Sequence, residues 1–183
     1  MSETWLVVVD PQRIFADPAS EWGSPMFADI VEPVRELAAR FGPERTLVTR
    51  WLPDGPREGS WVDYFARWPF ADRPADDPAF AVVEALSGLS AHPSLDRPTF
   101  GKWGPQMAAV VGPTPTLVLT GVSTDCCVIS TALAAADAGA RVLVAADACA
   151  GSTETDHAAA LQVMSLYDPQ IRLATSPAVS PTP

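Results

Sequence analysis

The residues best suited to covalent chemistry lie in the segment 121–128, which reads GVSTDCCV. It joins an apolar run to an alanine-rich run, a pattern that predicts a buried strand followed by a helix. A cysteine in the first turn of a helix lies at the positive end of the helix macrodipole, which favours the thiolate. Free N–H groups of that turn can stabilise an oxyanion. Cys126 and Cys127 are therefore candidate nucleophiles, although small cysteines that only pack a strand–helix junction produce the same pattern.

Two charged residues follow other apolar runs. Asp10 comes after the run at 5–9, and Lys102 comes after a weaker strand candidate at 97–101. Asp10 could act as a general base or could close the turn before Pro11, and Lys102 could tune Asp10 or be an ordinary surface lysine. In a parallel sheet the carboxyl ends of the strands form one edge, where ligands bind. An acid, an amine and a thiol are therefore expected to converge there.

The remaining cysteine and the histidines carry weaker signals. Cys149 is expected in the core, His92 in an exposed loop, and His157 packed within the last helix. Three cysteines without a C-x-x-C pair, together with only two histidines, disfavour a disulfide framework and a closed zinc site. A thiol redox role for the Cys126–Cys127 pair is a weaker alternative, because a disulfide between adjacent residues strains the peptide between them.

Strands and helices must position these groups, and the two alternate along the chain. The predicted strands are 5–9, 46–49, 97–101, 116–120, 141–145 and 171–174. The predicted helices are 25–41, 80–89, 125–138 and 153–167. Thr153 and Asp156 have the spacing of a capping box at the start of the last helix. This alternation predicts an α/β fold with right-handed crossovers and a parallel sheet covered by helices on both faces.

Two segments lack a clear period. Residues 51–78 are rich in Pro, Gly, Asp and Trp, which predicts a long loop or lid. Residues 175–183 are rich in Pro and Ser and are expected to form an extended or mobile tail after a single domain over residues 1–174. Four tryptophans lie in or beside the long loop and the Lys102 segment, where they could line a pocket or anchor the loop. They are Trp51, Trp61, Trp68 and Trp103.

Composition narrows the classes of partner. The chain has 183 residues, 48% of them hydrophobic, which is enough for one domain with a sizeable core. The net charge of −10 disfavours nucleic acid and anionic lipid as partners and leaves small molecules. No apolar stretch approaches the roughly 20 residues of a membrane span, and no basic leader precedes Trp5. A cytoplasmic location is the resulting expectation.

Several motifs together carry a family resemblance. The runs VVVDPQ at 7–12, FGK at 100–102 and GVSTDCCVISTA at 121–132 resemble those of the isochorismatase-like cysteine hydrolases. The run DAGARV at 137–142 continues the likeness, which extends in order from about Trp5 to Leu173. The resemblance implies a three-layer α/β/α sandwich around a six-stranded parallel sheet. It also implies a homo-oligomer, either a dimer or a tetramer.

The resemblance assigns roles to particular residues. It implies a catalytic triad of Asp10, Lys102 and Cys127, in which Cys127 is the nucleophile because it directly precedes Val128. It implies a cis peptide bond between Val122 and Ser123, with the N–H groups of Ser123 and Cys127 forming the oxyanion hole. The candidate substrate-pocket residues are Gln12, Phe15, Trp51, Trp103 and Thr131. Three further residues could meet a substrate carboxylate, namely Arg50, Arg57 and Arg67.

The implied activity is hydrolysis of a C–N bond in a small amide or in a carbamoyl or ureido compound, through a cysteine thioester. An isochorismatase-type enol-ether hydrolase and a non-catalytic small-molecule-binding protein of the same fold are the alternatives. Nicotinamidases of this family carry an Asp/His metal cluster after the second strand, whereas residues 50–78 contain no histidine. Neither a metal site nor any other cofactor is therefore expected.

Overall fold

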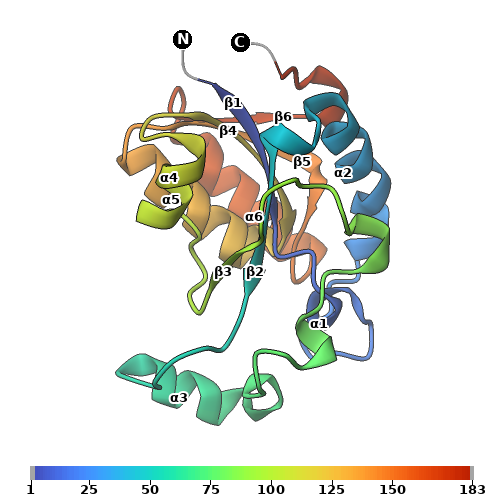
Figure 1. The fold of residues 1–183 in the computed structure, drawn as a ribbon, viewed down its shortest axis with the longest axis vertical. Helices are drawn as coiled ribbons and strands as arrows, with labels where there is room; N and C mark the ends of the chain where they lie inside the picture. Colours follow the sequence, from blue (N-terminus) through green and yellow to red (C-terminus); the bar gives the residue numbers. More distant parts are fainter. Residues whose placement is uncertain (1–2, 182–183) are drawn as a thin grey trace.

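The computed structural model describes residues 3–181, which form a six-stranded sheet in the order β3-β2-β1-β4-β5-β6 (Figure 1). All neighbouring strands are parallel. The strands are β1 (Thr4–Val9), β2 (Thr46–Trp51), β3 (Leu95–Arg97), β4 (Thr116–Val122), β5 (Arg141–Ala150) and β6 (Ile171–Ala174). The predicted α/β fold with a six-stranded parallel sheet is confirmed.

Helices cover both faces of the sheet. The α-helices of the described chain are α1 (Arg13–Ala16), α2 (Phe27–Phe41), α3 (Ser60–Arg67), α4 (Pro105–Val111), α5 (Ile129–Asp137) and α6 (Glu154–Ser165). Helix α2 contributes to the hydrophobic cluster on one face, and α4, α5 and α6 contribute to the cluster on the other. The apolar run of β1 has no alternation because Leu6 and Val8 point into the first cluster while Val7 and Val9 point into the second.

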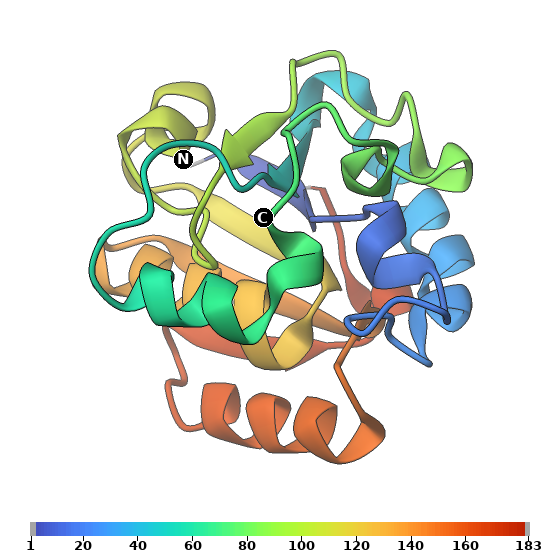
Figure 2. The ribbon, with the colours of Figure 1, turned by 90° about the horizontal axis from the view of Figure 1, so that it is seen from below.

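The carboxyl ends of the strands lie at the lower edge of the sheet in Figure 1. Helix α3, which lies between β2 and β3 in the sequence, passes across this edge of the sheet (Figure 2). Strand β1 is paired with β2 on one side and with β4 on the other. The strands β2 and β3 are added on one side of β1, and β4, β5 and β6 are added on the other side, so the strand order reverses at β1. Crevices at such a reversal are where ligands bind in open α/β sheets.

Several predicted elements differ from the observed ones. The helix expected at 80–89 is wrong, since the chain there forms two 3₁₀ turns, Pro78–Phe80 and Glu84–Leu86, which bury Phe80 and Leu86. The strand expected at 97–101 is displaced to Leu95–Arg97, because Pro98 lacks the N–H that would continue the ladder. The predicted irregular segment contains helix α3, and α4 was not anticipated.

The elements around the cysteine segment are close to those predicted. The helix expected from residue 125 begins instead as a π-helical turn, Thr124–Val128, and continues as α5. Strand β5 extends to Ala150 rather than ending at residue 145. The cap at Thr153 is confirmed, because its hydroxyl accepts a hydrogen bond of 3.1 Å from the N–H of Asp156.

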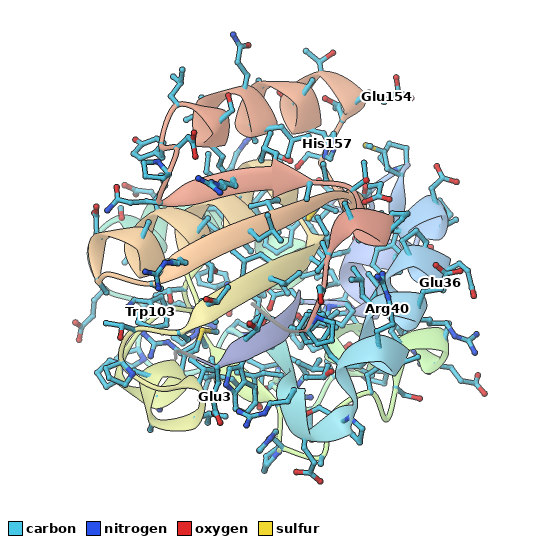
Figure 3. The ribbon with its side chains drawn as sticks, turned by 90° about the horizontal axis from the view of Figure 1, so that it is seen from above. Glu3, Glu36, Arg40, Trp103, Glu154 and His157 are labelled. Atoms are coloured by element: carbon cyan, nitrogen blue, oxygen red, sulfur yellow. The ribbon has the colours of Figure 1, made fainter. Side chains whose placement is uncertain are left out.

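The segment after residue 174 is packed rather than extended or mobile as far as the structure describes it. Ser176 donates hydrogen bonds to the carboxylate of Asp147 through both its N–H and its hydroxyl. Arg40 donates to the carbonyl oxygens of Ser176 and Val179, and Val179 is buried in the core (Figure 3). Residues 182–183 of the expected tail lie outside the described part. Within residues 3–181, no helix combines the length and apolarity needed to cross a membrane.

Candidate active site

Asp10 occupies the position immediately after β1, at the carboxyl edge of the sheet. Its backbone has a φ of 47°, a left-handed conformation that turns the chain sharply away from the strand. Its carboxylate is fully buried; one oxygen accepts a 2.7 Å hydrogen bond from the hydroxyl of Thr49 in β2. The other carboxylate oxygen, Oδ2, lies 3.0 Å from Nζ of Lys102. The carboxylate is therefore held between two neighbouring segments of the chain.

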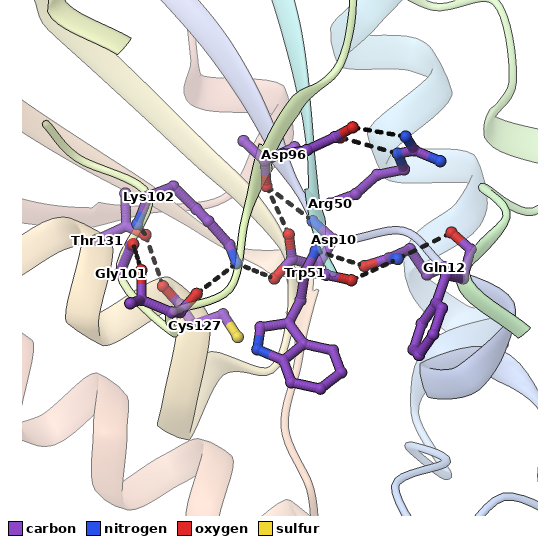
Figure 4. Close-up of polar contacts among 12 residues, drawn as sticks. Asp10, Gln12, Arg50, Trp51, Asp96, Gly101, Lys102, Cys127 and Thr131 are labelled. Atoms are coloured by element: carbon purple, nitrogen blue, oxygen red, sulfur yellow. Dashed lines mark hydrogen bonds and ion pairs between the residues drawn. The ribbon is translucent and has the colours of Figure 1, made fainter. Parts of the chain in front are cut away.

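Lys102 lies in the segment between β3 and α4 and is also fully buried. Besides the ion pair with Asp10, its Nζ donates a 2.8 Å hydrogen bond to the carbonyl oxygen of Thr99 (Figure 4). A lysine without water around it stays charged only if such partners replace its hydration. The buried position shows that Lys102 is not an ordinary surface lysine.

Cys127 lies in the π-helical turn that follows β4, with 4% of its surface exposed. In Figure 4 its sulfur points toward the side of Asp10 and the Trp51 indole. Thr131, one turn further on, donates a 2.7 Å hydrogen bond to the carbonyl oxygen of Cys127 and accepts one of 2.9 Å from the N–H of Lys102. Thr131 thus fixes the cysteine turn to the lysine segment.

A close approach of two strands brings Asp10 and the cysteine turn together. Gly121 of β4 is in register with Val9 of β1 and has a φ of +99°. A Cβ atom at this position would lie 2.1 Å from the carbonyl oxygen of Val9, so only glycine fits. The peptide bond between Val122 and Ser123, which follows Gly121 closely, is cis. The structure therefore brings Asp10, Lys102 and Cys127 from three distant parts of the chain to one place.

The electrostatics of the two adjacent thiols differ from the expectation based on the helix macrodipole. The pKa of Cys127 is raised well above its ordinary value by its hydrogen bond to the Cys126 thiol, by burial and by the nearby charge of Asp10; the charge of Lys102 opposes this shift. The pKa of Cys126 is lowered, chiefly by the hydrogen bond with Cys127. Cys127 is therefore a thiol at neutral pH, and its attack on a substrate needs a base.

A cavity of about 350 Å³ opens beside Cys127. Aromatic side chains supply much of its wall, namely Phe15, Trp22, Trp51, Tyr64, Trp68 and Phe100. Trp22 lies at the centre of this group, with its ring centroid between 5.0 and 6.1 Å from those of five other rings. Apolar, largely preformed cavities of this kind are typical of small-molecule sites.

Polar groups form the rest of the wall, and most of them come from the cysteine turn and its surroundings. They are Glu21, Ser123, Asp125, Cys126, Cys127 and Ser152. Asp125 is fixed by Ser152, whose N–H and hydroxyl each donate a 2.7 Å hydrogen bond to its carboxylate. Both Cys126 and Cys127 therefore face the same cavity, and Cys126 is the more exposed.

Only two of the predicted pocket residues line the cavity. These are Phe15 and Trp51. Gln12 is buried beside them and holds the wall, since its amide donates to the carbonyl oxygens of Trp51 and Phe80 and accepts from the N–H of Trp51. Thr131 ties two segments together as described. Trp103 is partly buried against the hydrophobic cluster that includes Cys127 and does not line the cavity (Figure 3). Trp103 is therefore a structural residue and not a pocket residue.

The three candidate arginines do not line the cavity either. Arg50 forms an ion pair with Asp96, with 2.6 Å between Nη2 and a carboxylate oxygen. The guanidinium of Arg57 lies 4.0 Å from the ring centroid of Phe65, and that of Arg67 lies 5.1 Å from the ring centroid of Trp68. Each of these groups already has a partner within the protein.

Cys149 and the two histidines lie outside the lining of the cavity. Cys149 is buried, as expected, and the loss of hydration raises its pKa. His157 of α6 packs against the cysteine turn, where its Nδ1 lies 2.8 Å from the hydroxyl of Thr124 (Figure 3). His92 is half-buried against the ring of Trp5 and not simply exposed. In the part of the chain that the structure describes, no group of three or more His, Cys, Asp or Glu side chains is placed to hold a metal ion.

The sequence analysis missed half of the aromatic wall, namely Trp22, Tyr64 and Phe100. The segment 61–68 carries a signal for Tyr64, because Trp61, Tyr64, Phe65 and Trp68 recur at helical spacing. That spacing is interrupted by charged residues and surrounded by prolines, which gave the segment the composition of a loop. Trp22 carries no such signal, because it lies in a turn between α1 and α2 and reaches the cavity only through the tertiary fold.

The chain matches known proteins over most of its length. The Isochorismatase domain family matches residues 4–175. A search of curated proteins finds no match.

Solved structures share the fold at low sequence identity. A cysteine hydrolase from Pseudomonas syringae pv. phaseolicola is 21% identical, with a TM-score of 0.80 over 96% of this chain and 89% of that one. An isochorismatase family protein from Desulfovibrio vulgaris is 19% identical, with a TM-score of 0.79 over 97% of this chain and 96% of that one. PnC1 from L. infantum, solved in complex with nicotinate, is 16% identical, with a TM-score of 0.75 over 98% of this chain and 96% of that one.

Proposed function

The chain belongs to the isochorismatase domain family, and from that membership we propose that it is a cysteine hydrolase that cleaves a C–N bond of a small amide, carbamoyl or ureido compound. The observation that carries the proposal is the convergence of Asp10, Lys102 and Cys127 beside a cavity that Cys127 lines. A buried thiol beside a buried carboxylate is the combination that nucleophilic attack on a carbonyl carbon requires, since the carboxylate can take the thiol proton.

The first half of the reaction forms a thioester. Asp10 removes the proton of the Cys127 thiol, and the sulfur attacks the carbonyl carbon of the substrate. The raised pKa of Cys127 makes this base necessary. The negative charge that develops on the carbonyl oxygen is held by the N–H groups of Ser123 and Cys127, and one such donor stabilises a transition state by about 3 kcal/mol in related acyl chemistry. Ser123 and Cys127 both line the cavity, which supports this assignment.

The second half releases the products. Asp10 passes its proton to the leaving nitrogen as the C–N bond breaks, and ammonia or an amine departs. Asp10 then removes a proton from a water molecule, and the resulting hydroxide attacks the thioester carbon. The C–S bond breaks, the sulfur of Cys127 takes the proton back from Asp10, and a carboxylic acid (a carbamic acid from a carbamoyl or ureido substrate) is released. Lys102 holds the carboxylate of Asp10 in place through their ion pair of 3.0 Å.

The test is a screen of small amides, ureas and carbamoyl amino acids for release of ammonia, with mass spectrometry to detect secondary amides. Cys127→Ala is expected to lower the rate on any substrate found by at least about a thousandfold while the fold stays intact. Cys126→Ala is the matched control, because it removes the neighbouring thiol and leaves the nucleophile. Undiminished turnover by Cys127→Ala would contradict the mechanism, and a protein that only binds small molecules would hydrolyse none of the compounds.

A further inference from the structure

The cavity beside Cys127 has an uneven distribution of charge. Among residues 3–181, the side chains with a formal charge that line it are Glu21 and Asp125, and both are carboxylates. Lys102, the only lysine in the sequence, does not line the cavity and is paired with Asp10. Asp125 is held at the wall by two hydrogen bonds from Ser152, and Glu21 is exposed at the mouth.

The basic side chains around the aromatic wall face other partners. Arg57 forms an ion pair with Asp72, with 2.5 Å between nitrogen and oxygen, and lies over the ring of Phe65. Arg67 lies over the ring of Trp68. A substrate carboxylate in the cavity would therefore lose hydration next to two like charges, without a guanidinium or ammonium group to replace the lost water.

The aromatic wall of the cavity favours a positively charged group. The face of an indole or phenol ring carries negative potential and attracts cations, most strongly where water is excluded. The rings of Trp51 and Trp68 are steeply inclined to that of Trp22, at interplanar angles of 78° and 65°, and all three line the cavity together with Tyr64. An ammonium group in this space would meet aromatic rings on several sides and carboxylates at the rim.

We propose that the substrate carries a positively charged ammonium group, which binds among Trp22, Trp68 and Tyr64 near Glu21 and Asp125, while its amide carbonyl reaches Cys127. The inference names the substrate class of the hydrolase proposed above and rests on that function for the reacting amide. The preference of the cavity for a cation follows from the residues that line it and is tested separately from catalysis.

The first experiment measures binding to the intact protein by quenching of tryptophan fluorescence. The probes are choline and its uncharged isostere 3,3-dimethylbutan-1-ol, which differ in charge but have nearly the same shape. Choline is expected to bind at least about tenfold more tightly. Glu21→Gln is expected to weaken choline binding about threefold and to leave the alcohol unchanged. Glu36→Gln, which removes an exposed carboxylate on α2 outside the cavity, is the matched control and should change neither.

The second experiment measures hydrolysis of three amides of similar size. They are (trimethylammonio)acetamide, which is cationic, 3,3-dimethylbutanamide, which is neutral, and malonamate, which is anionic. The cationic amide is expected to have the highest kcat/KM and malonamate the lowest. Trp22→Leu should reduce the preference for the cation, and Trp68→Leu provides a second variant if the first does not fold.

The outcomes separate the two proposals. Equal binding of choline and the alcohol, or faster turnover of the neutral or anionic amide, would overturn the cation preference even if Cys127-dependent hydrolysis is observed. Selective choline binding that is weakened by Glu21→Gln, without hydrolysis of any amide, would support the cation preference and contradict the proposed hydrolase.

Discussion

At the scale of single residues, the ion pair between Asp10 and Lys102 is the feature on which the site depends. Neither side chain is exposed, and each has one further hydrogen-bond partner, Thr49 for the carboxylate and Thr99 for the ammonium group. Replacing a whole buried pair is often tolerated, whereas removing one partner leaves an uncompensated charge. The pair therefore contributes to catalysis and stability in ways that mutation can separate.

Lys102→Met is expected to lower the free energy of unfolding by about 3 kcal/mol, because it leaves Asp10 buried without its partner. It should also abolish hydrolysis. The double variant Asp10→Asn with Lys102→Met should recover most of the lost stability and none of the activity. Urea unfolding, followed by circular dichroism, measures the first effect. A Lys102→Met protein as stable as the wild type would contradict a stabilising role for this ion pair.

The two adjacent thiols lead to a second prediction at this scale. The thiolate is the form that reacts with alkylating agents, so a lower pKa gives a faster reaction at neutral pH. Cys126 has the lowered pKa and the greater exposure, whereas Cys127 has the raised pKa. In the absence of substrate, iodoacetamide should therefore modify Cys126 before Cys127 at pH 7.

Tandem mass spectrometry of the peptide that contains both residues measures the order of labelling. Cys149 is the internal control, because it is buried and should stay unlabelled until the protein unfolds. Faster labelling of Cys127 would mean that the helix macrodipole outweighs burial and the charge of Asp10, as the sequence alone suggests.

At the scale of elements, the connection from β4 through the π-helical turn to α5 positions the nucleophile. Its first requirement is the close contact between Gly121 and the backbone of Val9, which sets β4 against β1 where both strands end. Its second is the hydroxyl of Thr131, which joins the turn to the Lys102 segment. The geometry of the site therefore depends on the register between the central strands β1 and β4.

Gly121→Ala is expected to destabilise the protein by about 3 kcal/mol or more, since its Cβ would overlap the carbonyl oxygen of Val9 and strain the backbone. Activity should fall as well, because the cysteine turn would shift. Gly112→Ala is the matched control. Gly112 also has a positive φ, but nothing lies within 4 Å of the added atom, so only about 1 kcal/mol is expected and activity should persist. Equal losses in the two variants would contradict the contact argument. Thermal unfolding and the amide assay provide the comparison.

The elements also show how far the sequence predicts this structure. Unbroken apolar runs such as 5–9 and 116–120 correctly predict strands covered on both faces, and Thr153 correctly predicts a helix start. The aromatic wall was not predictable in the same way. Trp22 and Phe100 belong to no periodic segment, and they meet only because turns far apart in sequence fold over the same edge of the sheet. Local patterns do not encode such contacts.

At the scale of the whole molecule, proton binding connects the buried thiols to stability. Burial raises the pKa of Cys149 from an ordinary value of 9.0, and the pKa of Cys127 is raised as well. The unfolded chain therefore loses these protons at a lower pH than the folded protein does. The stability linked to them is fully present below the ordinary thiol pKa and is lost as the pH rises above it.

The free energy of unfolding is accordingly expected to fall as the pH rises above 9.0, by up to about 1.4 kcal/mol per pH unit for each of these two thiols. The lowered pKa of Cys126 opposes this change only below that pH. Cys149→Ala should show a smaller slope than the wild type, because one of the two groups is gone. Urea unfolding at several pH values measures both slopes. Identical slopes would show that Cys149 does not retain its proton in the folded state.

The order of the strands has a consequence for synthesis of the chain. Strand β1 lies at the centre of the sheet, yet its partner β4 begins only at Thr116. At translation rates of roughly 5–20 residues per second, several seconds pass between the synthesis of the two strands. During that interval one edge of a strand that is apolar from Trp5 to Val9 has no partner from its own chain, and such edges are prone to pair with other chains. The nascent polypeptide therefore exposes an edge that favours aggregation until the second half of the sheet has been made.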